Sequence, residues 1–331
     1  MTRVHKGDQA FDHEGLYGTE TEMPFSGTRS FMRRRLSRNL DGVDYAVMGI
    51  PYDLSTSGRS GARFGPDAIR SATSQLSWGE VWPWNFDPFD RLAVVDYGDV
   101  FYQRGQPQEM LTNAYDQALH VLKTGTRLIG MGGDHLTTYP LLKAHAKIHG
   151  PMAYIQFDAH RDTADSSFLD HGSFVHYAMK EGLIEPKRSI QIGIRTHYSH
   201  EDDITVLYRP WVREHGISAL AAEIRRVVGD GPVYMSCDID AFDPAFAPGT
   251  GTPVVDGLQP NEVIDTIRAL STTNIVGMDV VEVAPAYDHS ERTALLGASV
   301  ILEHLCAVAS TRKCLGEIEV RRKVHTKHLS G

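Results

Sequence analysis

The sequence predicts a single-domain α/β protein, a three-layer α/β/α arrangement in which helices cover both faces of a mostly parallel sheet. Short apolar runs alternate along the chain with longer amphipathic stretches, which is typical of parallel strands joined by helices. With 331 residues and 41% hydrophobic content, the chain can bury a large core. Nothing between residues 40 and 310 resembles a flexible linker or an internal repeat, so we expect one domain and not two.

Four apolar runs are predicted to form buried parallel strands. Each is short, rich in β-branched or other apolar residues, and bounded by turn-forming or charged residues. These runs are Arg127 to Gly132, Met152 to Phe157, Val233 to Cys237 and Asn274 to Val281. Amphipathic stretches predict helices over Pro107 to Lys123, Thr137 to His149, Gly216 to Val228, Pro260 to Leu270 and Glu291 to Ala309.

Acidic residues and histidines follow the end of each predicted strand. In open α/β sheets, ligands bind beyond the carboxyl ends of the strands, so we expect these side chains to converge on one crevice. We also expect extended backbone within each cluster, because residues two apart on extended chain point to the same side. The residues concerned are His135, then Asp158, His160 and Asp162, then Asp238 and Asp240, and finally Glu282.

The chemistry of this cluster indicates a metal site. Burying even one unpaired carboxylate costs several kcal/mol, and neighbouring carboxylates add mutual repulsion that bound positive charge offsets. Six candidate ligands exceed what one tetrahedral site needs, whereas two ions that share carboxylates would use all of them. Oxygen-dominated ligation with some imidazole favours manganese or magnesium, with zinc and iron as alternatives. We expect two Mn²⁺ per chain.

Three long motifs in the chain resemble the metal motifs of the ureohydrolases, the arginase and agmatinase family. They occur in the family's order, as Gly132 to His135 (GGDH), Phe157 to Asp162 (FDAHRD) and Ser236 to Pro244 (SCDIDAFDP). The segments Ser57 to Pro66, Ala247 to Pro253 and Met278 to Pro285 are similar to the agmatinase branch. The resemblance covers roughly residues 25 to 313 and implies the arginase/deacetylase-like fold and hydrolysis of a guanidino compound to urea and an amine.

The resemblance also implies a role for each site residue. His135 and Asp162, with the shared Asp158 and Asp238, would bind the first manganese, and His160 and Asp240, with the same shared residues, the second. Glu282 would bind the substrate guanidinium. His171 would transfer a proton, and Asp162 at the metal would take part in that step. Three further acids are interpreted from their positions and not from the resemblance. Asp279 would support a ligand from outside the metal shell or bind backbone. Asp134 and Asp243 would orient the motif loops, because their side chains fall one residue out of the alternation.

These roles also fit the chemistry of a guanidinium. Its charge is delocalised over three nitrogens, so water attacks its carbon slowly unless a metal lowers the pKa of that water from 15.7 to about 7. The planar fork of N–H donors on a guanidinium matches a carboxylate such as Glu282. The departing amine must gain a proton before it leaves, a task suited to His171.

The loop after the second metal motif bears on substrate choice. Residues Thr163 to Asp170 contain two acids, Asp165 and Asp170, and no base. The charge of this loop is unfavourable for binding a substrate carboxylate and favourable for binding an ammonium group. We therefore expect agmatine, yielding putrescine for polyamine biosynthesis, with 4-guanidinobutyrate, 3-guanidinopropionate and arginine as alternatives. Arg161 is expected to point away from the metals.

The ends of the chain differ from the middle. Residues 1–24 lack periodicity and are expected to form an arm, whereas residues 314–331 are expected to be a frayed tail or an added sequence. No segment of export type is present, so we expect a cytoplasmic enzyme with no membrane partner and reduced thiols at all three cysteines. A net charge of −9 argues against a nucleic-acid partner. The resemblance implies a homo-oligomer, a trimer or a hexamer.

Two functions of other classes remain alternatives. An arginase-fold deacetylase would carry one zinc and lack the full second-metal set, whereas this chain has His135, His160 and Asp162. A non-catalytic, metal-dependent assembly protein would need the metal ligands but not Glu282 or His171. Counting bound metal and measuring urea release would separate these alternatives.

Overall fold

The sheet of this protein contains eight strands, and every pairing between neighbours is parallel. The computed structural model of the chain describes residues 16, 23–77, 79–197 and 202–312. The strand order is β2-β1-β3-β8-β7-β4-β5-β6. The bounds are β1 Tyr45–Ile50, β2 Val94–Asp99, β3 Arg127–Gly132, β4 Ala153–Phe157, β5 Ile190–Ile194, β6 Thr205–Tyr208, β7 Val233–Asp238 and β8 Ile275–Val281.

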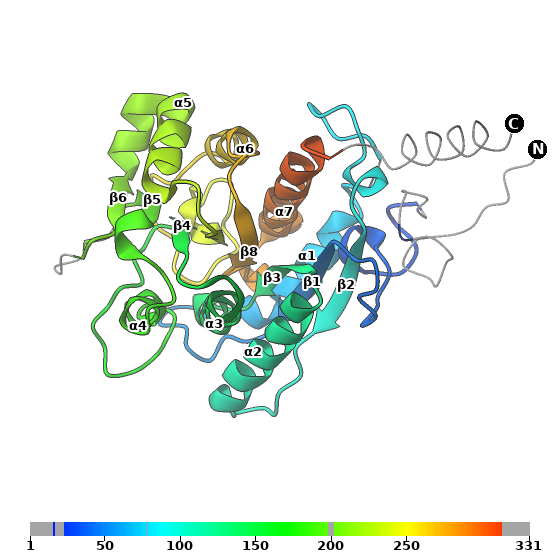
Figure 1. Cartoon of the computed structure of the whole chain (residues 1–331), viewed down its shortest axis with the longest axis horizontal. Helices are drawn as coiled ribbons and strands as arrows, with labels where there is room; N and C mark the ends of the chain where they lie inside the picture. The colour runs from blue at the N-terminus through cyan, green and yellow to red at the C-terminus, as the bar shows by residue number, and fades with distance from the viewer. Residues whose placement is uncertain (1–15, 17–22, 78, 198–201, 313–331) are drawn as a thin grey trace, which may run out of the picture.

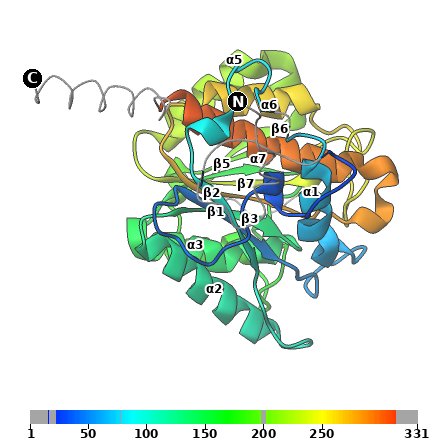
Figure 2. The same ribbon diagram turned by 90° about the vertical axis from the view of Figure 1, so that its right-hand side faces the viewer.

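Seven α-helices of the described chain cover the two faces of this sheet (Figures 1 and 2). One face is covered by α1 (Gly65–Thr73), α5 (Arg209–Val228), α6 (Pro260–Ala269) and α7 (Arg292–Ser310). The other face is covered by α2 (Pro107–Lys123), α3 (Thr138–His149) and α4 (Phe174–Lys180). The predicted three-layer α/β/α fold with a parallel sheet is therefore confirmed.

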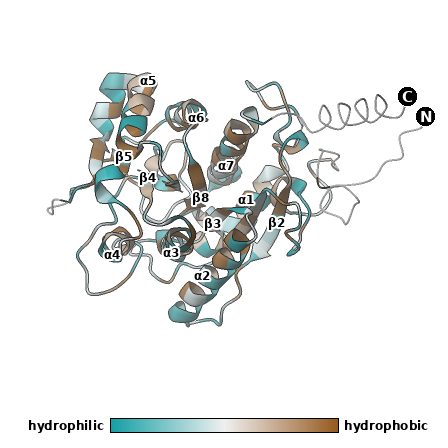
Figure 3. Cartoon of the chain, in the orientation of Figure 1, coloured by the Kyte–Doolittle hydropathy of each residue, from teal (hydrophilic) through white to brown (hydrophobic). Residues whose placement is uncertain are grey.

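Strands β3, β4, β7 and β8 lie side by side in the middle of the sheet and are buried along almost their whole length. Because helices cover both of their faces, these strands read as continuous apolar runs and not as alternating ones. Figure 3 shows the resulting hydrophobic colour of β5 and β8. The rigid centre of the sheet thus delivers four carboxyl ends to one edge.

The sequence predicted these four strands and five of the helices to within one or two residues at most boundaries. The exception is α5, which begins at Arg209 and not at the predicted Gly216. Gly216 has φ 74°, so α5 consists of two consecutive helical segments that are interrupted at this residue. The predicted helix began at Gly216 and therefore covered only the second segment of α5.

Helix α7 is long and apolar enough to cross a membrane by length and composition alone. Its candidate window, however, is 78% buried inside the protein. Residues such as Val300, Ile301 and Leu305 pack into the core beside β8. We therefore interpret α7 as a core helix.

The predicted arm and tail lie almost entirely outside the described residues. Of residues 1–24, only 16, 23 and 24 are described, and none of 314–331 is. Cys237 and Cys306, both within the described chain, are buried free thiols. The predicted domain bounds stay a prediction.

Candidate metal centre

Four predicted ligands meet at the edge of the sheet where β3, β4 and β7 end. The Nδ1 atom of His135 lies 3.1 Å from Asp158 Oδ2, 2.8 Å from Asp162 Oδ2 and 3.2 Å from Asp238 Oδ2. Although it is buried, this Nδ1 makes no hydrogen bond to any residue that the structure describes. A nitrogen lone pair surrounded by three carboxylate oxygens without hydrogen-bond geometry fits a metal ion well.

A second group of ligands lies directly beside the first. His160 Nδ1 is 3.1 Å from Asp240 Oδ2 and 3.5 Å from Asp158 Oδ1. Asp158 thus turns one oxygen toward His135 and the other toward His160, as a bridging carboxylate would. Each of the two groups contains enough donor atoms within 4.8 Å of one another to hold an ion.

The charges of this cluster are unfavourable without a cation. Burial and the charge of Asp158 raise the pKa of Asp162 to about 6. Burial and the charges of Asp240 and Asp158 also raise the pKa of Asp238 well above its usual value. Bound divalent ions would offset this repulsion and hold the carboxylates ionised.

The expectation of extended backbone through the ligand clusters is wrong. Strand β4 ends at Phe157, and Asp162 has a left-handed φ of 52°. The first aspartate of each motif instead folds the chain back on itself, as in an Asx turn. Asp158 Oδ1 accepts a hydrogen bond from His160 N at 2.6 Å, and Asp238 Oδ1 accepts one from Asp240 N at 2.7 Å. Tight turns, and not strand alternation, therefore bring each ligand pair together.

A buried hydrogen-bond chain fixes the ring of His135. Its Nε2 lies 2.9 Å from Ser236 Oγ, and the Ser236 hydroxyl donates to Asp279 Oδ1 at 2.5 Å. Since the single hydroxyl proton goes to Asp279, Ser236 Oγ accepts from His135 Nε2–H, which leaves Nδ1 as the lone pair. Asp279 thus supports the ligand His135 through Ser236, in line with one of the two roles considered for it. Sequence reasoning missed Ser236.

Glu282 and His171 lie next to this centre and contact each other. His171 Nδ1 is 2.9 Å from Glu282 Oε1, which also accepts from the backbone N–H of His135 at 3.0 Å. The other oxygen, Oε2, is buried and has no hydrogen-bond partner among the described residues. Glu282 has φ 64°, so the chain turns sharply where β8 ends. One carboxylate oxygen is therefore free to bind a cationic ligand.

Two opposing influences act on the protonation of His171. Burial lowers its pKa, but the hydrogen bond to Glu282 and the charges of Glu282, Asp162 and Asp134 together outweigh this and raise the pKa to about 9. At the other nitrogen, the Ser57 backbone N–H donates to Nε2 at 2.9 Å, and the Ser57 hydroxyl lies at 2.8 Å. The backbone donor requires a lone pair on Nε2 and so favours the neutral ring. The site therefore places His171 where it can both gain and release a proton.

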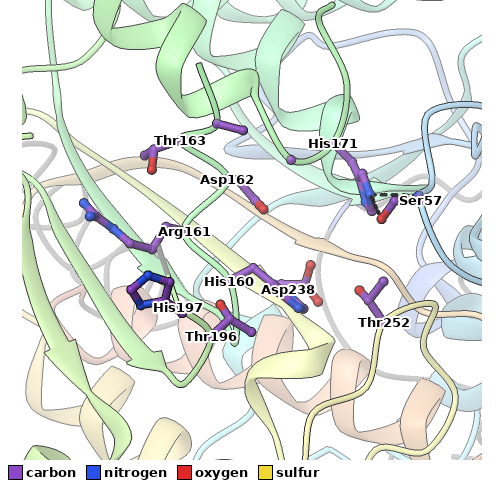
Figure 4. A pocket seen from close by; sticks show the side chains of 12 residues that line it. Ser57, His160, Arg161, Asp162, Thr163, His171, Thr196, His197, Asp238 and Thr252 are labelled. Atoms are coloured by element: carbon purple, nitrogen blue, oxygen red, sulfur yellow. Dashed lines mark hydrogen bonds between the residues drawn. The ribbon is translucent and has the colours of Figure 1, made fainter. Parts of the chain in front are cut away.

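His171 and three of the proposed ligands, His160, Asp162 and Asp238, line a cleft of about 240 Å³, shown in Figure 4. Arg161 points away from His160 and Asp238, as predicted. Its Nε donates to Gln191 at 2.9 Å and its Nη2 pairs with Asp202 at 2.6 Å. The lining residues are Ser57, His160, Arg161, Asp162, Thr163, Ala164, His171, Gly172, Thr196, His197, Asp238 and Thr252. Sequence reasoning assigned no role to Ser57, Thr196, His197 or Thr252.

Three acids were predicted to contact the substrate, Glu282, Asp165 and Asp170, and none of them is among these lining residues. The side chain of Asp165 is 69% exposed and lies 3.5 Å from His176. Asp170 accepts a hydrogen bond from the N–H of Gly172 at 3.0 Å, within the loop that carries His171. Their assignment to the substrate stays a prediction.

Asp134 and Asp243 were expected to orient the motif loops, and their hydrogen bonds confirm this. Asp134 accepts from the N–H and the hydroxyl of Ser55 at 2.9 and 2.7 Å. Asp243 accepts from the N–H groups of Ala245 and Gly257, both at 2.9 Å. Each aspartate therefore joins its motif to a neighbouring loop.

Comparison with known proteins supports the assignment that the motifs suggested. The arginase family model matches residues 43–307. The chain is 49% identical to an agmatinase of Chromobacterium violaceum over 92% of this chain and 96% of that protein. It is 51% identical to an agmatinase of Edwardsiella ictaluri over 82% of this chain and 90% of that protein.

Solved structures agree with these sequence relatives. A hypothetical agmatinase from Burkholderia thailandensis superposes with a TM-score of 0.90 and 47% identity, covering 92% of this chain and 97% of that one. The proclavaminate amidino hydrolase of Streptomyces clavuligerus superposes with a TM-score of 0.81 and 37% identity, covering 87% and 99%. The chain therefore belongs to the arginase family and is a ureohydrolase.

Proposed function

We propose that this enzyme hydrolyses agmatine to putrescine and urea with two Mn²⁺ per chain. The observation that carries the proposal is the pair of ligand groups that share Asp158, beside the free buried oxygen of Glu282. The similarity to agmatinases over most of the chain supports agmatine as the substrate. When bound, the metal ions supply positive charge and lower the pKa of water near the guanidinium carbon.

Glu282 would bind and orient the guanidinium. A carboxylate accepts the N–H donors of a planar guanidinium, and Oε2 is the oxygen that lacks a partner in the described chain. The second oxygen is held by His171 and the His135 backbone, so the carboxylate cannot rotate freely. A fixed carboxylate lowers the entropic part of the barrier by holding the substrate in one orientation.

His171 would move the proton that the leaving amine needs. Water adds to the guanidinium carbon, the bond from that carbon to the substituted nitrogen breaks, and this nitrogen takes up a proton as it leaves. His171 lies on the cleft wall, hydrogen-bonded to Glu282 and Ser57, and can supply it. Asp162, held 2.8 Å from the ring of His135, would take part with His171 in this proton transfer to the leaving amine.

Several finer features belong to the same proposal. Manganese is proposed over magnesium, zinc and iron because carboxylates dominate the ligand set. We further propose that the enzyme works in the cytoplasm as a homo-oligomer, a trimer or a hexamer. Asp165 and Asp170 are proposed to attract the substrate ammonium group electrostatically from the loop above the cleft.

The experiment that tests the proposal compares four substrates on one manganese-loaded preparation. Urea release is measured with agmatine, 4-guanidinobutyrate, 3-guanidinopropionate and arginine, and bound metal is counted in the same sample. We expect two manganese ions per chain and the highest kcat/KM for agmatine. A hundredfold preference for a carboxylated substrate would overturn the choice of agmatine. One zinc with release of acetate from an acetylated amine would instead identify a deacetylase.

A further inference from the structure

Arg195, which follows β5, binds main-chain carbonyl groups on two other segments of the site. Its Nη2 donates to Asp240 O at 2.6 Å and to Val254 O at 2.7 Å. Its Nη1 donates to Ala241 O at 3.1 Å, and its Nε donates to Val255 O at 3.1 Å. A planar guanidinium with five N–H donors is the side chain suited to such a set of acceptors.

The backbone of Arg195 binds a third segment of the site, the loop after β4. Its N–H donates to Ala159 O at 3.1 Å, and the hydroxyl of Thr196 donates to the same oxygen at 3.0 Å. Ala159 lies between the ligands Asp158 and His160, and its own N–H donates to Asp240 Oδ1 at 3.1 Å. Arg195 therefore joins the loop after β4 to the turn after β7.

Arg195 is also linked to the carboxylate of Asp240 indirectly, through its hydrogen bond to Val254. Val254 lies in the segment that also carries Thr252, whose hydroxyl donates to Asp240 Oδ2 at 3.1 Å. That oxygen is the one that faces His160 Nδ1. Arg195 thus restrains Asp240 through its own carbonyl and through the segment that orients its side chain.

The charge of Arg195 acts in the same direction as its hydrogen bonds. Within the described chain, Arg195 forms no ion pair with a carboxylate and donates to carbonyl groups. Burial lowers its pKa, while Asp240, Asp158 and Asp243 act electrostatically to raise it. A guanidinium stays protonated in proteins, so this positive charge partly offsets the repulsion among the buried aspartates.

We propose that Arg195 is a positioning residue for the second metal ion, the one assigned to His160 and Asp240. The inference rests on the two-metal assignment proposed above and on nothing about the substrate. Asp240, which is assigned to the second ion alone, accepts a hydrogen bond from the Arg195 guanidinium at 2.6 Å. Among the described residues, the guanidinium donates only to main-chain carbonyl groups and to neither His135 nor Asp162, the ligands assigned to the first ion alone. Loss of the guanidinium therefore weakens the second site selectively.

The test uses Arg195→Lys and Arg195→Gln in the full chain. Lysine keeps the charge, but its single ammonium group cannot replace a planar fork that reaches Asp240, Ala241, Val254 and Val255. Bound manganese is counted after equilibration at graded free Mn²⁺, and electron paramagnetic resonance distinguishes coupled ion pairs from single ions. We expect the dissociation constant of the second ion to rise at least tenfold in both variants, so that single-ion signals replace the pair.

Two further variants frame the result. His160→Asn removes a ligand of the second ion directly and serves as the reference spectrum for a singly occupied site. Arg188→Lys is the matched control, because the Arg188 guanidinium also binds a main-chain carbonyl, that of Val228 at 2.8 Å, at the opposite end of β5. We expect Arg188→Lys to keep both ions.

The inference is overturned if both Arg195 variants keep two ions with unchanged affinity, or if both ions weaken equally. Thermal unfolding is also measured with and without chelator. The inference is overturned if Arg195→Lys lowers the stability of the metal-free protein as much as that of the metal-loaded protein, since the role of Arg195 is then structural. Should Arg195→Gln fail to fold, Arg195→Lys decides alone. Failure of the two-metal proposal looks different, because the unaltered protein then binds fewer than two ions.

Discussion

His171 Nδ1 lies 2.9 Å from Glu282 Oε1, and this contact leaves Glu282 Oε2 as a buried oxygen without a hydrogen-bond partner in the described chain. We predict that Glu282→Gln lowers kcat/KM for agmatine at least about 30-fold, because removing one partner of a buried charged pair costs about 2 kcal/mol or more. The measurement is urea release across substrate concentrations. Metal content is counted in parallel and should stay at two ions, since Glu282 is not a proposed ligand.

Glu181→Gln is the control for this charge change. Glu181 is a partly exposed glutamate that pairs with Lys143 at 3.0 Å, away from the cleft. Its substitution should leave kcat/KM within about twofold, because exposed ion pairs contribute only about 0–1 kcal/mol. A Glu282→Gln enzyme with unaltered kcat/KM would show that the free Oε2 does not bind substrate.

Much of this site could be predicted because the ends of the buried strands can be recognised in the sequence. The buried runs before His135, Asp158, Asp238 and Glu282 are short and apolar, and parallel strands bring their carboxyl ends to one edge. The convergence of these residues therefore follows from sheet topology, whatever the local backbone does. The local backbone itself was mispredicted, because Asx turns and the positive φ of Asp162 leave no mark on apolar periodicity.

For other parts of the site, the sequence marked the segment by its resemblance to the agmatinase branch but not the role of the individual residue. Ser57 and Thr252 belong to segments distant in sequence, and only the folded chain brings them to His171 and Asp240. Ser236 lies inside a metal motif, but a single serine in an apolar strand is ordinarily interpreted as a small core residue with no functional role. The edge strand β6, of four residues, is partly exposed and too short for a clear period. Contacts across the fold, and not composition, decide these roles.

Ser236→Ala should weaken the first metal ion. The serine hydroxyl links His135 Nε2 to Asp279, and this link sets which ring nitrogen faces the carboxylates. Losing such an outer partner of a ligand costs roughly 10- to 100-fold in metal affinity. The measurement is manganese binding by titration against a competing chelator. Ser236→Thr, which keeps the hydroxyl, should retain more of the affinity, and equal loss in both variants would contradict the link.

Gly133→Ala should damage both stability and activity. A Cβ at residue 133 would lie 1.8 Å from the carbonyl oxygen of Tyr52, so the backbone must move next to His135. Overpacking of this kind costs roughly 1–3 kcal/mol or more. Chemical denaturation and urea release measure the two effects. Gly125→Ala is the control, since no described residue beyond its chain neighbours lies within 4 Å of a Cβ at this position and only its φ of 86° is unfavourable.

His145 should make the protein lose stability in acid. It is fully buried in α3, with Nδ1 2.8 Å from Leu141 O and its ring edge-on to Tyr234. Burial lowers its pKa from 6.5 to about 4. The unfolded chain therefore binds a proton that the folded chain rejects as the pH falls below 6.5, and stability declines until about pH 4. The difference between these pKa values corresponds to roughly 3 kcal/mol.

His145→Asn removes this titration, and the measurement is the free energy of unfolding by denaturant between pH 7 and 4. The variant should be less stable at pH 7, because packing against Tyr234 is lost. Its stability should nevertheless fall by roughly 3 kcal/mol less over this range than that of the unaltered protein. Both proteins lose bound cations in acid, so comparing their slopes removes that shared contribution. Parallel slopes for the two proteins would contradict the lowered pKa of His145.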